Sequence, residues 1–144
     1  MASTVDLSTT YFSARAAKGI YQRSIASFYI DFSATGQSLA QNETMTIVDL
    51  PAGCIIYGGM IDIETAQATI SDVDLGVSTD GTTAADLADG ITLAATGFLA
   101  FNNVTAGGVK PVAASNLVFT NKDAQTLNSA KVRVKIDIAF FTQD

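Results

Sequence analysis

Aspartates cluster in one part of this sequence, and their carboxylates are the groups that could bind a metal ion or transfer protons. The stretch from Ser71 to Ile91 reads SDVDLGVSTDGTTAADLADGI and contains five aspartates and no basic residue. An EF-hand calcium loop requires Asp-x-Asp-x-Asp-Gly and a glutamate at its twelfth position. Counted from Asp72, the third ligand is missing and the twelfth residue is Thr83. We therefore predict no metal site, with a calcium ion held by Asp72, Asp74 and a loop carbonyl as the alternative.

The same two aspartates could instead form a catalytic carboxylate pair. Outward side chains two residues apart on a strand lie roughly 6.5–7 Å from each other, a spacing that some glycosidases use. Catalysis also needs a cleft that raises the pKa of one carboxyl group, and nothing in the sequence indicates one. The stretch is better explained by a strand through Asp72–Val77 with both aspartates on its solvent side. A turn at Asp80 and a single helical turn over Ala84–Leu87, ended by Gly90, would complete it.

Other catalytic chemistry is excluded by composition. The sequence contains no histidine and a single cysteine, Cys54. Histidine-dependent triads and histidine-ligated zinc are therefore impossible, and a lone cysteine forms neither an internal disulfide nor a thiolate metal cluster. Because Cys54 precedes the apolar residues Ile55 and Ile56, we expect it to pack as a small core residue. The sequence predicts no enzymatic activity and no bound cofactor.

Charge is distributed unevenly along the chain. The net charge is −6, yet residues 1–24 hold three bases and one acid, and no base occurs between Ser24 and Val109. Nucleic-acid binding requires a basic footprint that this body lacks, and no run of about 18 apolar residues indicates a membrane span. Charged residues make up 15% of the chain, against roughly 25% in an average soluble domain. We therefore expect much of the surface to contact other protein.

Alternation of apolar and polar residues predicts strands throughout the body. The clearest case is Lys131–Phe140, in which every second residue is apolar. Gly58 and Gly59 indicate a bulge, a bend or a close approach of another backbone within a longer strand. The other candidate strands are Ile25–Phe32, Thr44–Leu50, Cys54–Thr65, Thr69–Val77, Ile91–Ala94, Gly97–Phe101, Val109–Ala113 and Asn116–Thr120. About eight short strands with few helical signals indicate an all-β fold. An eight-stranded jelly roll is our first interpretation and an immunoglobulin-like sandwich the second.

The first 24 residues differ from the rest in charge and in aromatic content. We therefore divide the chain into an N-terminal arm, residues 1–24, and a jelly-roll domain, residues 25–144. Aromatic residues and arginine carry much of the energy of protein interfaces, so we predict that the arm docks on a partner protein. A frayed terminus or an added edge strand is the alternative. The predicted partner-binding residues are Tyr11, Phe12, Arg15, Lys18, Tyr21 and Arg23.

The segment from Leu50 to Gly97 resembles small virion proteins of tailed bacteriophages. The resemblance rests on an LPAG turn at residues 50–53, an I-x-x-x-x-x-I strand, the run SDVDLGVSTDG and a loop containing ADGI. It is similar to capsid decoration, or cement, proteins with a jelly-roll body. Such a resemblance implies a non-enzymatic homotrimer that binds the major capsid protein on the outer surface of the virion, after synthesis in the bacterial cytoplasm.

A second class of function stays open from the sequence. Some carbohydrate-binding proteins also have a jelly-roll fold, so the fold alone does not determine the function. The alternative is a carbohydrate- or receptor-binding β-sandwich module of a phage fibre or spike. The chain has four tyrosines and no tryptophan, which disfavours a sugar site without excluding it.

Overall fold

The computed structural model describes Val5–Asp6 and residues 21–141. Nine strands and no helix occur in these ranges, so none of the described residues forms a helix able to cross a membrane. The strands are β1 (Val5–Asp6), β2 (Tyr21–Asp31), β3 (Thr44–Leu50), β4 (Ile55–Thr65), β5 (Val73–Ser78), β6 (Ala88–Ile91), β7 (Gly97–Ala100), β8 (Ser115–Asn121) and β9 (Lys131–Phe141).

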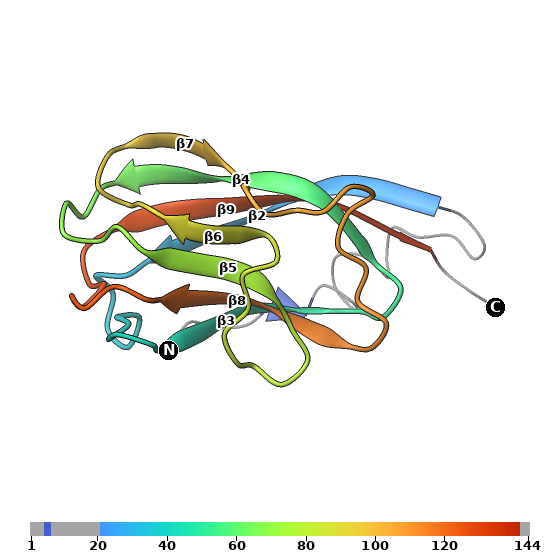
Figure 1. The fold of residues 1–144 in the computed structure, drawn as a ribbon, viewed down its shortest axis with the longest axis horizontal. Coiled ribbons are helices and arrows are strands. Elements are labelled where there is room, and N and C mark those ends of the chain that lie inside the picture. Colours follow the sequence, from blue (N-terminus) through green and yellow to red (C-terminus); the bar gives the residue numbers. More distant parts are fainter. Residues whose placement is uncertain (1–4, 7–20, 142–144) are drawn as a thin grey trace.

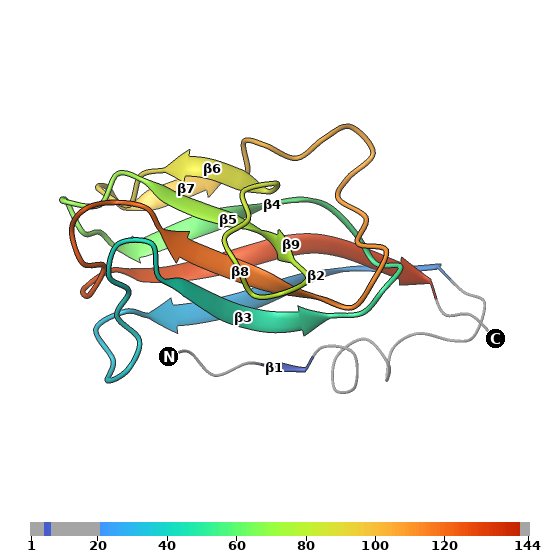
Figure 2. The same cartoon turned by 60° about the horizontal axis from the view of Figure 1, so that its bottom comes forward.

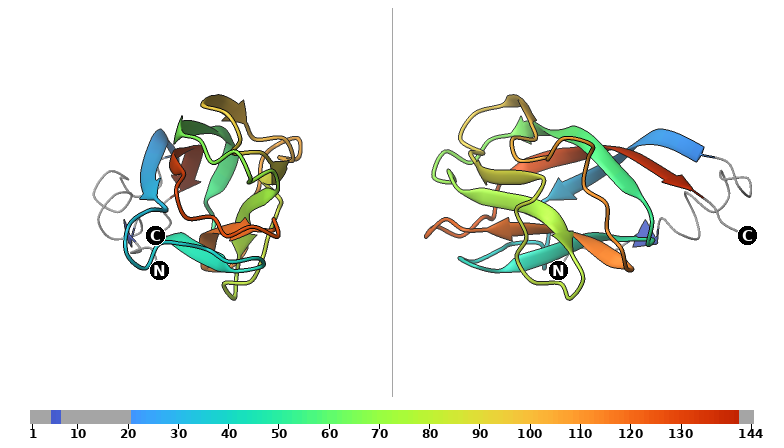
Figure 3. Two further views of the ribbon diagram at one scale, coloured as in Figure 1. Left: turned by 90° about the vertical axis from the view of Figure 1, so that its left-hand side faces the viewer. Right: turned by 45° about the vertical axis from the view of Figure 1, so that its right-hand side comes forward.

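The strands form two sheets that pack face to face (Figures 1 and 3). One sheet has the order β2-β9-β4-β7 and the other β1-β3-β8-β5-β6. The antiparallel pairs β2·β9, β3·β8, β4·β7 and β5·β6 make one long folded ribbon whose successive pairs alternate between the sheets. This arrangement is the jelly roll, so the predicted fold is confirmed. The two-residue β1 adds a parallel edge beside β3 (Figure 2).

The core lies between the sheets and is built from the apolar residues that alternate along each strand. In β9, Val132, Val134, Ile136 and Ile138 are all fully buried. The rings of Phe32 and Phe119 meet across the sandwich with their centroids 5.3 Å apart. Leu39 and Leu127 form a bridge that closes one end of the core.

The glycine pair in β4 has the two effects expected from the sequence. The register between β4 and β9 shifts between Ile56 and Gly58, which marks a bulge. At Gly59 a Cβ atom would collide with the backbone carbonyl oxygen of Lys135 on β9 and would lie within 2.9 Å of the Phe101 ring, so glycine permits the close approach of both. Strand β4 therefore bends, and the connection that follows β7 packs against it.

The predicted helical turn over Ala84–Leu87 is wrong. This segment lies instead against the outer surface of β5 (Figure 2), where the Leu87 amide donates to the Leu75 carbonyl at 3.1 Å. Gly76 permits the approach, because a Cβ atom there would lie 2.5 Å from both the Ala84 carbonyl carbon and Asp86 Oδ1. Contact with β5 therefore satisfies backbone groups that a helical turn would have left unpaired.

Two strand predictions also need correction. The strand expected at Ile91–Ala94 is β6, and it ends at Ile91 because its partner β5 begins pairing there at Val73. Residues 109–113 form no strand, and only a single bridge joins Val109 to Ile56. Gly107 and Gly108, both with positive φ, hold this connection in a turn.

Candidate functional site

Two of the five aspartates of the acidic stretch, Asp80 and Asp86, hold the chain after β5 in place. Asp80 accepts hydrogen bonds from Ser78 and Thr82, which closes the turn after β5 and lowers the pKa of the Asp80 carboxyl group. Asp86 Oδ1 accepts from the Val77 amide at 2.8 Å and fixes the β5–β6 connection on β5. Both carboxylates therefore act as acceptors for local backbone and hydroxyl groups.

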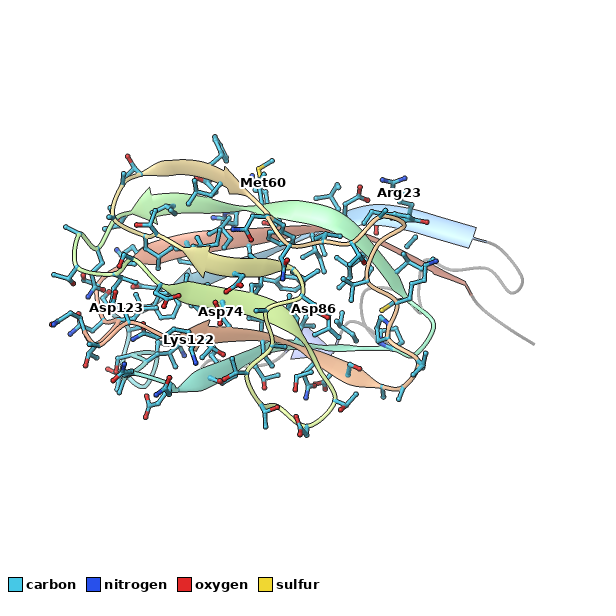
Figure 4. The ribbon with its side chains drawn as sticks, viewed as in Figure 1. Arg23, Met60, Asp74, Asp86, Lys122 and Asp123 are labelled. Carbon is cyan, nitrogen blue, oxygen red and sulfur yellow. The ribbon has the colours of Figure 1, made fainter. Side chains whose placement is uncertain are left out.

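The predicted position of the Asp74 side chain is wrong. We expected it on the solvent side of β5, the strand on which Figure 4 labels it, but only 6% of it is exposed. Burial raises its pKa, and the nearby carboxylates of Asp89 and Asp72 raise it further. The Gly90 amide donates to Asp74 Oδ1 at 3.1 Å and opposes this shift. Strand β6 and the residues around it cover the Asp74 side chain. The alternation of apolar and polar residues along β5 could not predict this contact.

Within the described ranges, no three or more acidic or cysteine side chains come close enough to hold a metal ion. Asp72 and Asp74 are accompanied by Asp89, but Asp74 is buried and engaged with the Gly90 amide. Cys54 is fully buried, and this burial raises the pKa of its thiol to about 11. The thiol is therefore protonated at neutral pH and is a core residue, as the sequence predicts.

The predicted partner-binding residues fall on both sides of the boundary of the described structure. Tyr11, Phe12, Arg15 and Lys18 lie outside the described residues. Residues 21–24 belong to β2 and pair with β9, so the four residues before the predicted start of the domain are part of its sheet. Tyr21 is the first residue of β2.

Arg23 lies on the outward side of β2, where it contacts other residues of its own chain (Figure 4). Its guanidinium group donates to both carboxylate oxygens of Asp137 on β9. This pairing lowers the pKa of the Asp137 carboxyl group. The guanidinium carbon also lies 4.3 Å from the centre of the Tyr57 ring.

An exposed surface that the sequence did not reveal lies on the four-stranded sheet. We call it the outer face: the outward side chains of β2, β9, β4 and β7, on the side away from the five-stranded sheet. Four large apolar side chains are exposed there, namely Ile25 (60%), Tyr29 (48%), Met60 (37%) and Phe98 (65%). Each occupies a position on its strand where alternation would place a polar residue, and this departure was the signal available in the sequence.

Charged side chains of both signs lie between these apolar groups. Arg23 pairs with Asp137, Lys131 with Asp31 and Arg133 with Glu64, at distances of 2.5, 4.0 and 3.1 Å. The Arg133 guanidinium also lies 5.1 Å from the centre of the Tyr29 ring, and the Lys135 ammonium 5.6 Å from that of Phe98. The cationic side chains of the outer face therefore lie close to carboxylates and aromatic rings of the same sheet.

A shallow hollow of about 440 Å³ opens on the outer face. Gly58 and Gly59 contribute no side chains to it, and Ile25, Met60 and Lys135 line it. Asp137 also lines this hollow, where its carboxylate is paired with Arg23 and this pairing lowers its pKa. Because the hollow is shallow and exposed apolar groups surround it, the outer face is suited to contact with another surface.

Neither a protein-family model nor a curated protein matches this sequence.

Solved structures of similar fold come from bacteriophage capsids. A chain in the capsid of Ralstonia phage GP4 superimposes with a TM-score of 0.59 and 13% identity over 85% of each chain. A chain in the cyanophage Pam1 capsid asymmetric unit gives 0.53 and 14%, over 93% of this chain and 99% of that one. A chain in the acidic stable capsid structure of Helicobacter pylori bacteriophage KHP30 gives 0.52 and 17%, over 85% and 94%. At these identities the likeness shows a shared jelly-roll fold of nearly equal length.

Proposed function

We propose that this protein is a structural component of a bacteriophage virion that binds the outside of the capsid and stabilises its lattice. In this proposal it is a decoration, or cement, protein with no enzymatic activity. Its partners are the major capsid protein and further copies of itself, which associate as a homotrimer. Neither nucleic acid nor a membrane is a partner.

The observation that carries the proposal is the likeness to chains from three phage capsids. Each match covers at least 85% of both chains, so each of those capsids contains a chain of about this size and fold. The described jelly roll, residues 21–141, presents the outward sides of two sheets. A chain of this kind is suited to a role that depends on surface contact.

The chemistry of the described residues supports a structural role. Three of the five carboxylates of the acidic stretch, those of Asp74, Asp80 and Asp86, accept hydrogen bonds from nearby groups of the chain, and the one thiol is buried. The outer face exposes large apolar side chains, which single monomeric domains tend to limit and which often mark contact sites. A structural role in a shell depends on contact surfaces of this kind, either with the capsid or between copies of the chain, and it requires no reacting group.

The arm is the second part of the proposal. Tyr11, Phe12 and Tyr21 would provide apolar anchors on the capsid or on a neighbouring copy, and Arg15 and Lys18 would pair with acids there. Truncation of an aromatic anchor at an interface costs about 2 kcal/mol or more, whereas an exposed ion pair contributes about 0–1 kcal/mol. We therefore assign the binding energy of the arm mainly to its aromatic residues.

The test is co-sedimentation with empty shells assembled from the major capsid protein of the phage that encodes this chain. We expect saturable binding and a higher melting temperature of the decorated shells. A variant lacking residues 1–20 keeps all of β2, and we expect it to fold normally and to bind less tightly. The absence of co-sedimentation, together with an unchanged shell melting temperature, would refute lattice stabilisation. Specific binding to a glycan array would favour the carbohydrate-binding alternative instead.

A further inference from the structure

The outer face is electrically neutral, whereas the rest of the described body is acidic. The face holds four bases on β2 and β9 and four acids on β2, β4 and β9. Between residues 32 and 130, the charged residues outside the face are two lysines and eight acids. Two copies of this chain would repel each other through most of their surfaces. The outer face is where a second copy can approach without that cost.

Two charges on the face differ from the others. Among the described residues, Lys135 and Asp62 are the members of the face that form no ion pair, because the other six charged groups pair with one another. Lys135 on β9 stands opposite Met60 on β4, and Asp62 is two residues further along β4. Diagonal neighbours of this kind lie roughly 7–8 Å apart. The two charges are opposite in sign, adjacent and central to the face.

This arrangement is complementary to itself under a two-fold rotation. The two-fold axis would lie in the plane of the contact and pass midway between Lys135 and Asp62, at right angles to the line that joins them. Rotation about this axis places the lysine of each copy opposite the aspartate of the other. Each unpaired charge is thereby neutralised, and the ion pair forms twice across the contact. A two-fold interface requires that one patch complement itself in this way, and the exposed Ile25, Tyr29 and Phe98 surround the central charges with apolar area.

The size of the face agrees with a contact between proteins. Strands β2, β4 and β9 each have 11 residues, and with β7 they span a flat area on the order of 600 Å² at normal strand rise and spacing. Because side chains project from the sheet, its solvent-accessible area is larger than this flat area. One partner in a standard protein interface buries about 800 Å². The sheet is therefore large enough to form one side of a stable interface.

We propose that two copies of this protein pack outer face against outer face about a two-fold axis, with Lys135 of each copy bound to Asp62 of the other. The inference goes beyond capsid binding and does not depend on it, since the pair would form in free protein. Because the contact is two-fold, it makes the number of chains in the assembly even. That number is two, or six if the proposed homotrimers join through this face.

The test measures the mass of the assembly by sedimentation and light scattering over a range of protein concentrations. The wild-type protein is expected to contain an even number of chains. Lys135→Glu places like charges opposite each other twice per contact, and we expect the mass to halve with the association weakened at least about tenfold. Asp62→Lys should have the same effect. The double variant with both changes restores opposite charges and should regain the wild-type mass.

Lys122→Glu is the matched control, because it makes the same charge change on the turn after β8, away from the outer face (Figure 4). We expect it to leave the number of chains unchanged. Circular dichroism on every variant checks that the fold is retained. An odd number of chains in the wild type would overturn the inference. So would a double variant that stays at half mass, or a control that weakens association as much as Lys135→Glu.

Discussion

Replacement of Gly76 by alanine tests how the β5–β6 connection covers β5. A Cβ atom at this position would lie 2.5 Å from the Ala84 carbonyl carbon and 2.5 Å from Asp86 Oδ1. Both distances are shorter than any ordinary contact, and one of the atoms belongs to the backbone. The connection must therefore move away from the strand in the Gly76→Ala variant.

The magnitude follows from the contacts that would be lost. Overpacking a buried site costs about 1–3 kcal/mol. Movement of the connection also breaks the hydrogen bond from the Val77 amide to Asp86 Oδ1, which is 2.8 Å long, and hydrogen bonds to charged groups contribute about 1.5–3 kcal/mol. We expect a loss of about 2–5 kcal/mol in the free energy of unfolding, out of a typical total of about 5–15 kcal/mol. The melting temperature should fall by about 5–15 °C.

The assay is urea unfolding at low protein concentration, followed by circular dichroism. Gly58→Ala is the matched control, because nothing lies within 4 Å of a Cβ atom at Gly58. Alanine at a compatible glycine position stabilises a protein by about 0.4–1 kcal/mol, so this variant should equal or slightly exceed the wild type. If Gly76→Ala unfolds within about 0.5 kcal/mol of the control, a small effect typical of surface changes, the connection does not rest on β5.

Two further predictions concern the interior. Asp74→Asn should stabilise the protein at pH 7, because it removes a buried charge and keeps an oxygen acceptor for the Gly90 amide. The raised pKa of Asp74 means that the wild type gains stability as the pH falls through that pKa toward the ordinary value of 3.8. The advantage of the variant in urea unfolding should therefore shrink between pH 7 and pH 4, and an advantage that grows would contradict the assignment. Phe119→Ala removes a fully buried ring that contacts Phe32 and should cost about 3–5 kcal/mol in the same measurement. A loss below about 1 kcal/mol would show that the two sheets do not pack through this pair.

The sequence predicted the parts of the fold that depend on local alternation. Strand β3 has the predicted bounds, Thr44–Leu50, and β9 extends one residue past the predicted end at Phe140. One face of each strand must be apolar to build a core, so period-two alternation locates such strands without knowledge of their partners. The number and type of the strands then made a jelly roll the first choice. Composition alone likewise excluded whole classes of site, because the chain has no histidine and a single cysteine.

Features that depend on contacts distant in sequence were decided by the tertiary structure. Asp74 follows the alternation of β5 toward the solvent side, yet it is buried because β6 and its neighbours cover it. The segment Ala84–Leu87 has the composition of a helical turn, yet it packs irregularly against β5 because Gly76 leaves room for it. The outer face depends on four strands that the chain brings together only after folding, and the proximity of Lys135 and Asp62 exists only through the β4–β9 register. Alternation in the sequence predicts to which side of its strand a side chain points. Only the packing of the sheets determines which residues that side chain contacts.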